Sequence, residues 1–293
     1  MKLRTAAVSY FNTYPITAGL RDSKLVELVK AIPSGCAAML ESGEADLALV
    51  PIGAIAGKDY EIVPGIGLGC DGPVETVLLV GERPPQEWDE VYLDTASRTS
   101  RVLAQLVLDA MGLHPKFTSM DSAESVPRAV GTKGAHVIGD RAFDAKKPYM
   151  LDLGEEWSRL TGLPFVFAVF AARPGVITPE IVAELTRAAQ VGLGLRTELA
   201  QEFAREKGGD PERYRRYLTR RMRYAVGPYE QSAMEAFFAK AAEKGLLPPT
   251  TLKFADDRIV TRRAHRAVSI DGALQKGADG GRLDADELEA LDA

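Results

Sequence analysis

One supersecondary pattern is predicted twice in this chain: a short helix followed by a buried strand. In the first copy, Ser34 opens a helix that ends at Gly43, and an apolar strand follows at residues 45–51. In the second copy, the helix is capped at residues 121–122 and the strand lies at 134–140. Between the copies, an apolar strand at 76–80 runs into a Gly/Pro/charged stretch that suits an interdomain crossover. Two helix–strand copies separated by a crossover predict two α/β lobes.

The length of the chain agrees with this division, because 293 residues suit two domains of ~100–200 residues each. A second break, Arg173-Pro174-Gly175, falls where a return crossover would lie. We therefore expect lobe one at 1–80 plus 173–263 and an inserted lobe two at 84–170. Residues 264–293 are expected to form a C-terminal extension that contains a helix, because 283–288 reads as a capping-box start. A ligand would bind in the cleft between the lobes.

Composition excludes several classes of function. Hydrophobic residues make up 46% of the chain, yet no segment approaches ~18 uninterrupted apolar residues, so we expect no membrane partner. The N-terminus has a three-residue apolar run, far short of the ~7–15 residues of a signal-peptide core, so we expect a cytoplasmic protein. Cys36 and Cys70 are then expected to be two buried thiols. The three histidines are scattered, so we expect no metal site.

The net charge of −5 argues against nucleic-acid binding by the molecule as a whole. One segment, residues 213–224, departs from this average, because six arginines and three tyrosines alternate along an expected helix. The segment could be an anion or nucleic-acid patch. We favour the alternative that it is a solvated helix face with its tyrosines packed inward.

A run of hydroxyl residues gives the strongest candidate site. Ser97, Arg98, Thr99 and Ser100 stand at the start of an expected helix, after a strand at 91–94. Hydroxyls and exposed backbone N–H groups at a helix N-terminus form a pocket for a carboxylate or phosphate. The alternative is plain capping, which needs only one of the three hydroxyls.

A second candidate is the turn at residues 71–76, which could present Thr76 to the cleft or serve as ordinary turn chemistry. The sequence contains no Gly-x-Ser-x-Gly elbow, no Cys-His arrangement, no P-loop and no dinucleotide fingerprint. The glycines of 65–69 are a weak match to a phosphate loop, because no helix follows them. The residues alone therefore predict a two-lobed anion binder with a polar cleft.

Five motifs stand in one order across residues 1–260: VSYFNTYP at 8–15, GCDGPV at 69–74, SRTS at 97–100, IGD at 138–140 and WSRLTGLPFVFAVF at 157–170. Together they resemble the chorismate dehydratase of the futalosine pathway to menaquinone. The resemblance implies an α/β, type II periplasmic-binding-protein-like fold. It further implies conversion of chorismate to 3-[(1-carboxyvinyl)oxy]benzoate and water, without a metal or an organic cofactor.

The resemblance also assigns roles to residues. It implies that Asn12 and Thr76 are catalytic, although the family usually has serine at the second position. Threonine keeps the hydroxyl but adds a methyl group that stiffens χ1. Neither residue is a good base at neutral pH, so the enolpyruvyl carboxylate of the substrate is a candidate base. The expected substrate-binding residues are Ser9, Tyr10, Thr13, Gly72, Pro73, Ser97, Arg98, Thr99, Ser100, Gly139, Asp140 and Phe165.

Two other functions stay open. One is a 1,4-dihydroxy-6-naphthoate synthase-like enzyme of the same pathway and fold, whose first loop and whose strand after the tryptophan read differently. The other is a cytosolic binding protein that holds a small carboxylate without turnover. The tail from residue 268 resembles the opening segment of a radical cyclase of the same pathway, and the sequence predicts no oligomeric state.

Overall fold

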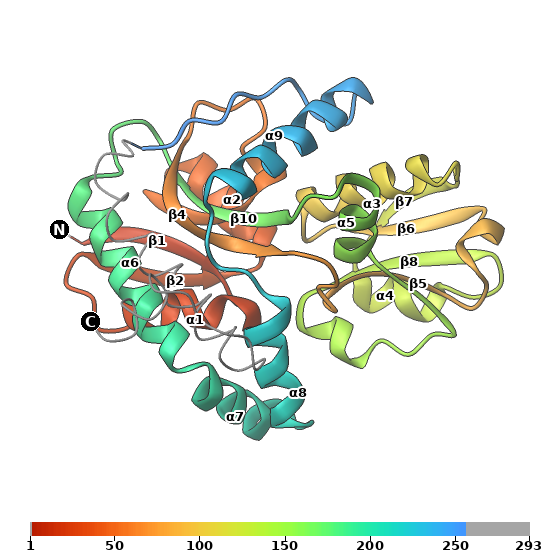
Figure 1. The fold of residues 1–293 in the computed structure, drawn as a ribbon, viewed down its shortest axis with the longest axis horizontal. Coiled ribbons are helices and arrows are strands. Elements are labelled where there is room, and N and C mark those ends of the chain that lie inside the picture. The colour runs from red at the N-terminus through yellow and green to blue at the C-terminus, as the bar shows by residue number, and fades with distance from the viewer. Residues whose placement is uncertain (1, 256–293) are drawn as a thin grey trace, which may run out of the picture.

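The computed structural model describes residues 2–255, and two five-stranded sheets form the centres of two lobes (Figure 1). The sheet of lobe one has the order β2-β1-β3-β10-β4. In it, β1 pairs in parallel with β2 and β3, whereas β10 runs antiparallel between β3 and β4. Its strands are β1 (Leu3–Val8), β2 (Val26–Ala31), β3 (Leu47–Pro51), β4 (Glu61–Cys70) and β10 (Phe165–Ala172).

The sheet of lobe two has the order β7-β6-β8-β5-β9. Here β6 pairs in parallel with β7 and β8, and β5 runs antiparallel to β8 and β9. Each lobe thus combines parallel strands with one strand that runs against its neighbours. The strands of lobe two are β5 (Val77–Gly81), β6 (Glu90–Asp94), β7 (Lys116–Met120), β8 (Lys133–Ile138) and β9 (Tyr149–Asp152).

The chain crosses between the lobes earlier than the sequence suggested. Strand β5 belongs to lobe two and β10 to lobe one, so the expected boundaries of 1–80 plus 173–263 and 84–170 differ from the sheets by one strand at each crossover. The Gly/Pro stretch after β5 is instead a turn within lobe two. Its Gly81 lies under the Trp88 ring, where an added Cβ would come within 2.6 Å of the indole nitrogen. A Gly/Pro signal marks a turn, but it does not distinguish a turn within a lobe from a crossover.

Helices cover both sheets, and their capping follows the sequence. Thr178 caps the N-terminus of α6, Ser97 caps α3, and Gly43 ends α2 with a φ of 81°. These are the expected caps. The helices are α1 (Tyr14–Thr17), α2 (Pro33–Ser42), α3 (Arg98–Ala110), α4 (Ser122–Arg128), α5 (Leu153–Thr161), α6 (Pro179–Gly194), α7 (Arg196–Lys207), α8 (Pro211–Arg216), a π-helix η6 (Tyr217–Arg221) and α9 (Pro228–Glu243).

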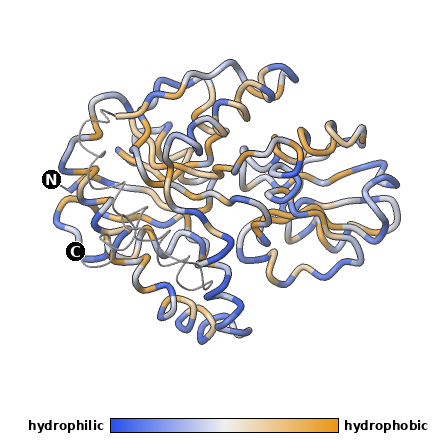
Figure 2. Tube along the Cα trace, viewed as in Figure 1, coloured by the Kyte–Doolittle hydropathy of each residue, from blue (hydrophilic) through white to orange (hydrophobic). Residues whose placement is uncertain are grey.

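The apolar residues gather in the strands and on the inner helix faces of both lobes (Figure 2). The glycines at 65–69 lie in β4, so they form no phosphate loop. Gly67 and Gly69 instead donate backbone hydrogen bonds to the segment at 223–224, which closes over this strand. At Gly69 an added Cβ would stand 2.7 Å from the Phe165 carbonyl oxygen. The glycines therefore serve close backbone packing.

Two expectations from composition can be compared with the described residues. Cys36 and Cys70 are buried free thiols, as predicted. Within residues 2–255, no helix has the length and apolar character needed to cross a membrane. The expected C-terminal extension at 264–293 lies outside the described residues.

Candidate functional site

A pocket containing about 490 Å³ of space free of atoms, part of it open to solvent, lies between the two lobes. No residue that lines this pocket is charged. Six of the expected site residues line it: Tyr10, Asn12, Thr76, Ser97, Ser100 and Gly139.

The N-terminus of α3 supplies hydroxyls from lobe two. The Ser97 hydroxyl accepts a hydrogen bond from the Ser100 backbone N–H at 3.4 Å, so Ser97 is the helix cap. The Ser100 hydroxyl is buried and has no partner in the described chain. A buried hydroxyl without a partner costs about 1–3 kcal/mol. Its place in the pocket wall therefore suits a ligand group that completes the hydrogen bond.

The other two residues of this loop, Arg98 and Thr99, make contacts with lobe one. Thr99 is fully buried, and its hydroxyl accepts a hydrogen bond from the Gly53 N–H of lobe one at 2.8 Å. Arg98 is exposed and lies 3.4 Å from a carboxylate oxygen of Glu41. Both contacts join α3 to lobe one. Thr99 and Arg98 thus contact lobe one, because α3 begins directly beside the interface between the lobes.

Asn12 and Thr76 meet at a residue that the sequence did not single out. The Thr76 hydroxyl lies 2.7 Å from the Tyr217 hydroxyl, and the Asn12 side chain is a neighbour of the same phenol. The carbonyl oxygen of the Asn12 side chain is buried and has no hydrogen-bond partner among the described residues. Burial raises the pKa of Tyr217 well above its usual value, so the phenol keeps its proton.

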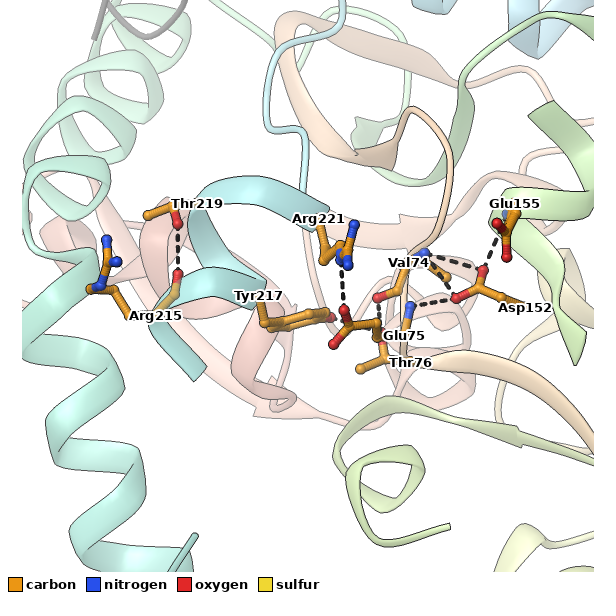
Figure 3. A network of polar contacts seen from close by, with 9 residues as sticks. All are labelled: Val74, Glu75, Thr76, Asp152, Glu155, Arg215, Tyr217, Thr219 and Arg221. Carbon is orange, nitrogen blue, oxygen red and sulfur yellow. Dashed lines mark hydrogen bonds and ion pairs between the residues drawn. The ribbon is translucent and has the colours of Figure 1, made fainter. Parts of the chain in front are cut away.

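The backbone before Thr76 is tightly held (Figure 3). The carboxylate of Asp152, the N-cap of α5, accepts hydrogen bonds from the N–H groups of Val74 and Glu75 as well as from the start of α5. Glu75 has a φ of 64°, and its carboxylate accepts a hydrogen bond of 2.6 Å from Arg221. A left-handed conformation in a residue other than glycine costs on the order of 1–3 kcal/mol, and such strain clusters at functional sites.

Gly72 and Pro73 shape this connection without lining the pocket. Gly72 has a φ of 98°, a conformation that side chains disfavour, and an added Cβ there would meet nothing within 4 Å. Both residues thus lie in the turn, and their expected contacts with substrate stay a prediction.

Asp140 links the lobes. Its carboxylate accepts a hydrogen bond of 2.9 Å from the Phe11 backbone N–H, which fixes the loop that carries Asn12. The preceding Gly139 has a φ of 66° and lies against the Tyr10 ring, where an added Cβ would come within 2.7 Å. Asp140 itself does not line the pocket, and its expected contact with substrate stays a prediction.

Asp140→Asn should make the protein more stable above about pH 6. Burial raises the pKa of Asp140 from 3.8 to about 6, against opposing effects of the Phe11 hydrogen bond and Lys207. The folded state therefore holds the proton more tightly than the unfolded state, and wild-type stability falls as pH rises from about 4 to about 6. Asparagine keeps an acceptor for Phe11 and removes this penalty, of about 3 kcal/mol.

Thermal unfolding of both proteins between pH 4 and 8 measures the effect. The difference in Tm should vanish near pH 4 and reach its full size above pH 6. Asp89→Asn is the control of opposite sign, because hydrogen bonds from Lys133 and Thr132 lower the pKa of that exposed carboxyl. Parallel curves of Tm against pH for wild type and Asp140→Asn would contradict the raised pKa of Asp140.

Three further expected contacts lie outside the pocket wall. Thr13 is buried, and its hydroxyl donates to the Val8 carbonyl oxygen at 2.7 Å, which shapes the first loop. Ser9 continues the pairing with β2 through its backbone N–H. Phe165 is 1% exposed and packs against Trp157, whereas Phe167 lines the pocket. A shift in the pairing of β10 with β4 falls at Phe167, and such a bulge re-aims a side chain in a way that the sequence does not show.

The arginine-rich segment shows the packing that we favoured. Its tyrosines at 214, 217 and 224 are buried. Arg213 donates to the Phe143 carbonyl oxygen, Arg215 pairs with Glu212, and Arg223 lies 3.4 Å from Asp71. Among residues 2–255, no group of three or more His, Cys, Asp or Glu side chains is placed to hold a metal ion.

Two lobes of mixed α/β sheets with a pocket between them define the class of periplasmic-binding-protein-like folds. Solved structures of this class are similar to the chain at low sequence identity. A protein of Archaeoglobus fulgidus superposes with a TM-score of 0.66 at 17% identity, covering 84% of this chain and 98% of that one. The alkanesulfonate-binding protein of Xanthomonas axonopodis pv. citri, bound to MOPS, gives a TM-score of 0.60 at 15% identity and covers 84% and 94%. The expected fold is confirmed.

The model of a family described as menaquinone biosynthesis matches residues 3–243, and the chain belongs to this family. The chain is also 29% identical over 250 residues to a chorismate dehydratase of Thermus thermophilus, covering 78% of this chain and 91% of that protein. Both findings support the resemblance stated from the motifs.

Proposed function

We propose that this protein dehydrates chorismate to 3-[(1-carboxyvinyl)oxy]benzoate. One observation carries the proposal: unpaired oxygen atoms of Asn12 and Ser100, from different lobes, belong to residues of the same uncharged pocket as Thr76. Unpaired buried polar atoms are rare in native proteins and call for a ligand or water. Membership of the menaquinone biosynthesis family and the name of the Thermus thermophilus relative support the choice of substrate.

Recognition of the substrate follows from the polarity of the pocket. Chorismate has two carboxylates, and the pocket wall offers no charged side chain to pair with them. The N-terminus of α3 offers partial positive charge together with the hydroxyls of Ser97 and Ser100. We place one carboxylate there. Apolar residues such as Leu68 and Phe167 then contact the ring.

The reaction breaks the C–H bond at the ring carbon that carries the enolpyruvyl ether and the C–O bond at the neighbouring carbon. The departing hydroxyl leaves as water with the transferred proton, and the ring becomes aromatic without oxidation or reduction. In our proposal, the Asn12 carbonyl oxygen accepts a hydrogen bond from the substrate hydroxyl, and the Thr76 hydroxyl donates to the departing oxygen. Neither side chain is a base at neutral pH, so the enolpyruvyl carboxylate of the substrate takes the proton.

Incubation of the purified protein with chorismate tests the proposal. Proton NMR should show loss of the cyclohexadiene signals and growth of the aromatic signals of the product. Binding of chorismate without turnover would favour the non-catalytic alternative. Absence of both binding and turnover would favour a different substrate, such as that of a 1,4-dihydroxy-6-naphthoate synthase-like enzyme.

Ser100→Ala should raise the KM for chorismate about tenfold and leave kcat nearly unchanged. It removes one hydrogen bond to a charged group, a change of about 1.5 kcal/mol in binding. Ser125→Ala is the matched control, since the Ser125 hydroxyl in α4 is equally buried and unpartnered but lies outside the pocket wall. Steady-state kinetics of both variants decide the point. An unchanged KM in Ser100→Ala would move the carboxylate site away from α3.

A further inference from the structure

The buried phenol of Tyr217 contacts the hydroxyl of Thr76, an expected catalytic residue. We propose that Tyr217 is a positioning residue that directs the proton of the Thr76 hydroxyl into the pocket. The proposal rests on the dehydration function proposed above. It stands on the contact of 2.7 Å between the two hydroxyl oxygens and on the burial of the phenol.

The direction of the hydrogen bonds follows from a count of donors. A phenol has one hydrogen to donate. Within residues 2–255, the hydrogen bond of the buried Tyr217 hydroxyl is its contact with Thr76, so the phenol donates its hydrogen to Thr76. Thr76 then accepts, and its hydrogen must point elsewhere. A second acceptor, the Val74 carbonyl oxygen, lies at 3.5 Å, at the limit of hydrogen-bond range, so the pocket is the favoured direction.

The Tyr217 ring is fixed well enough for this task. Tyr217 is 1% exposed, and its ring meets Phe143 edge to face with centroids 5.0 Å apart. Phe11, next to Asn12, stacks on the Tyr217 ring with the ring centroids 6.1 Å apart. A closely packed aromatic ring holds its hydroxyl in one place. The position of the proton donor is therefore set by the core and not by the substrate.

The π-helix η6 explains why the phenol reaches this point. Its first residue, Tyr217, contacts Thr76, and its last residue, Arg221, pairs with Glu75, so both ends hold consecutive residues of the connection between the lobes (Figure 3). A π-turn widens the helix locally, and such turns are frequent at functional sites. The strained Glu75 and the hydroxyl of Thr76 are thus positioned by one element.

Tyr217→Phe tests the proposal, because it removes the hydroxyl and keeps the ring. We expect kcat to fall about tenfold or more, with KM within about twofold of wild type. Tyr214→Phe is the matched control: Tyr214 belongs to the same aromatic cluster, is buried, and donates to the Gly208 carbonyl oxygen away from the pocket. Its kcat should not change.

A double variant separates positioning from stability. If Tyr217 acts through the Thr76 hydroxyl, Thr76→Val with Tyr217→Phe should be no slower than Thr76→Val alone. An equal loss of kcat in both backgrounds, or a Tyr217→Phe variant with full activity, would overturn the proposal. Thermal unfolding of each variant shows whether a loss of fold explains a loss of rate. An inactive wild type would refute the dehydration function itself, and the positioning role would fall with it.

Discussion

Thr76→Val should lower kcat for chorismate dehydration about 100-fold while the fold and most of the chorismate affinity stay in place. Valine has nearly the same shape as threonine but lacks the hydroxyl that lies 2.7 Å from Tyr217 at the pocket wall. Loss of one positioned donor to a developing charge costs on the order of 100- to 1,000-fold in rate. Steady-state kinetics, together with Tm, measure the effect.

Thr76→Ser is the matched control, because it keeps the hydroxyl and restores the residue that is usual in chorismate dehydratases. It should retain or improve kcat. A Val variant with full activity would show that Thr76 has only a packing role, and equal losses in the Ser and Val variants would point to the methyl group instead of the hydroxyl.

Asn12→Ala should have a comparably large effect, lowering kcat about 100-fold or more. The change removes the unpaired carbonyl oxygen that we place against the substrate hydroxyl. Ser125→Ala is again the control, since its buried hydroxyl lies outside the pocket wall. Comparable kinetics in the two variants would contradict a role for Asn12 in catalysis.

Much of the architecture was predictable from local signals in the sequence. Thr178 with Pro179, and Ser97 before α3, mark helix starts because capping is a property of a few neighbouring residues. The apolar runs of β3 and β10 predicted buried strands for the same reason. The partners of a strand depend on distant residues, so the membership of β5 and β10 in the two sheets was not predictable from these runs.

The candidate site divides in a similar way. Asn12, Thr76, Ser97 and Ser100 were found from motifs and hydroxyl spacing, and the structure places all four at one pocket. Tyr217 was missed because its only signal was an arginine-rich run, and the π-helix that brings it to Thr76 depends on tertiary packing. Asp152 was missed because the sequence around it shows only an ordinary helix cap. In the structure, its carboxylate accepts hydrogen bonds from four N–H groups in two segments that are far apart in the sequence.

Isotope-labelled chorismate tests the dehydration reaction most directly. The substrate carries deuterium on the ring carbon that bears the enolpyruvyl ether, and wild-type protein is compared with Thr76→Val. The account predicts that wild type forms 3-[(1-carboxyvinyl)oxy]benzoate with no deuterium at any ring position and with one product formed for each chorismate consumed. The Val variant should do so about 100-fold more slowly. Chorismate that binds and is recovered unchanged, with its deuterium retained, would contradict the account.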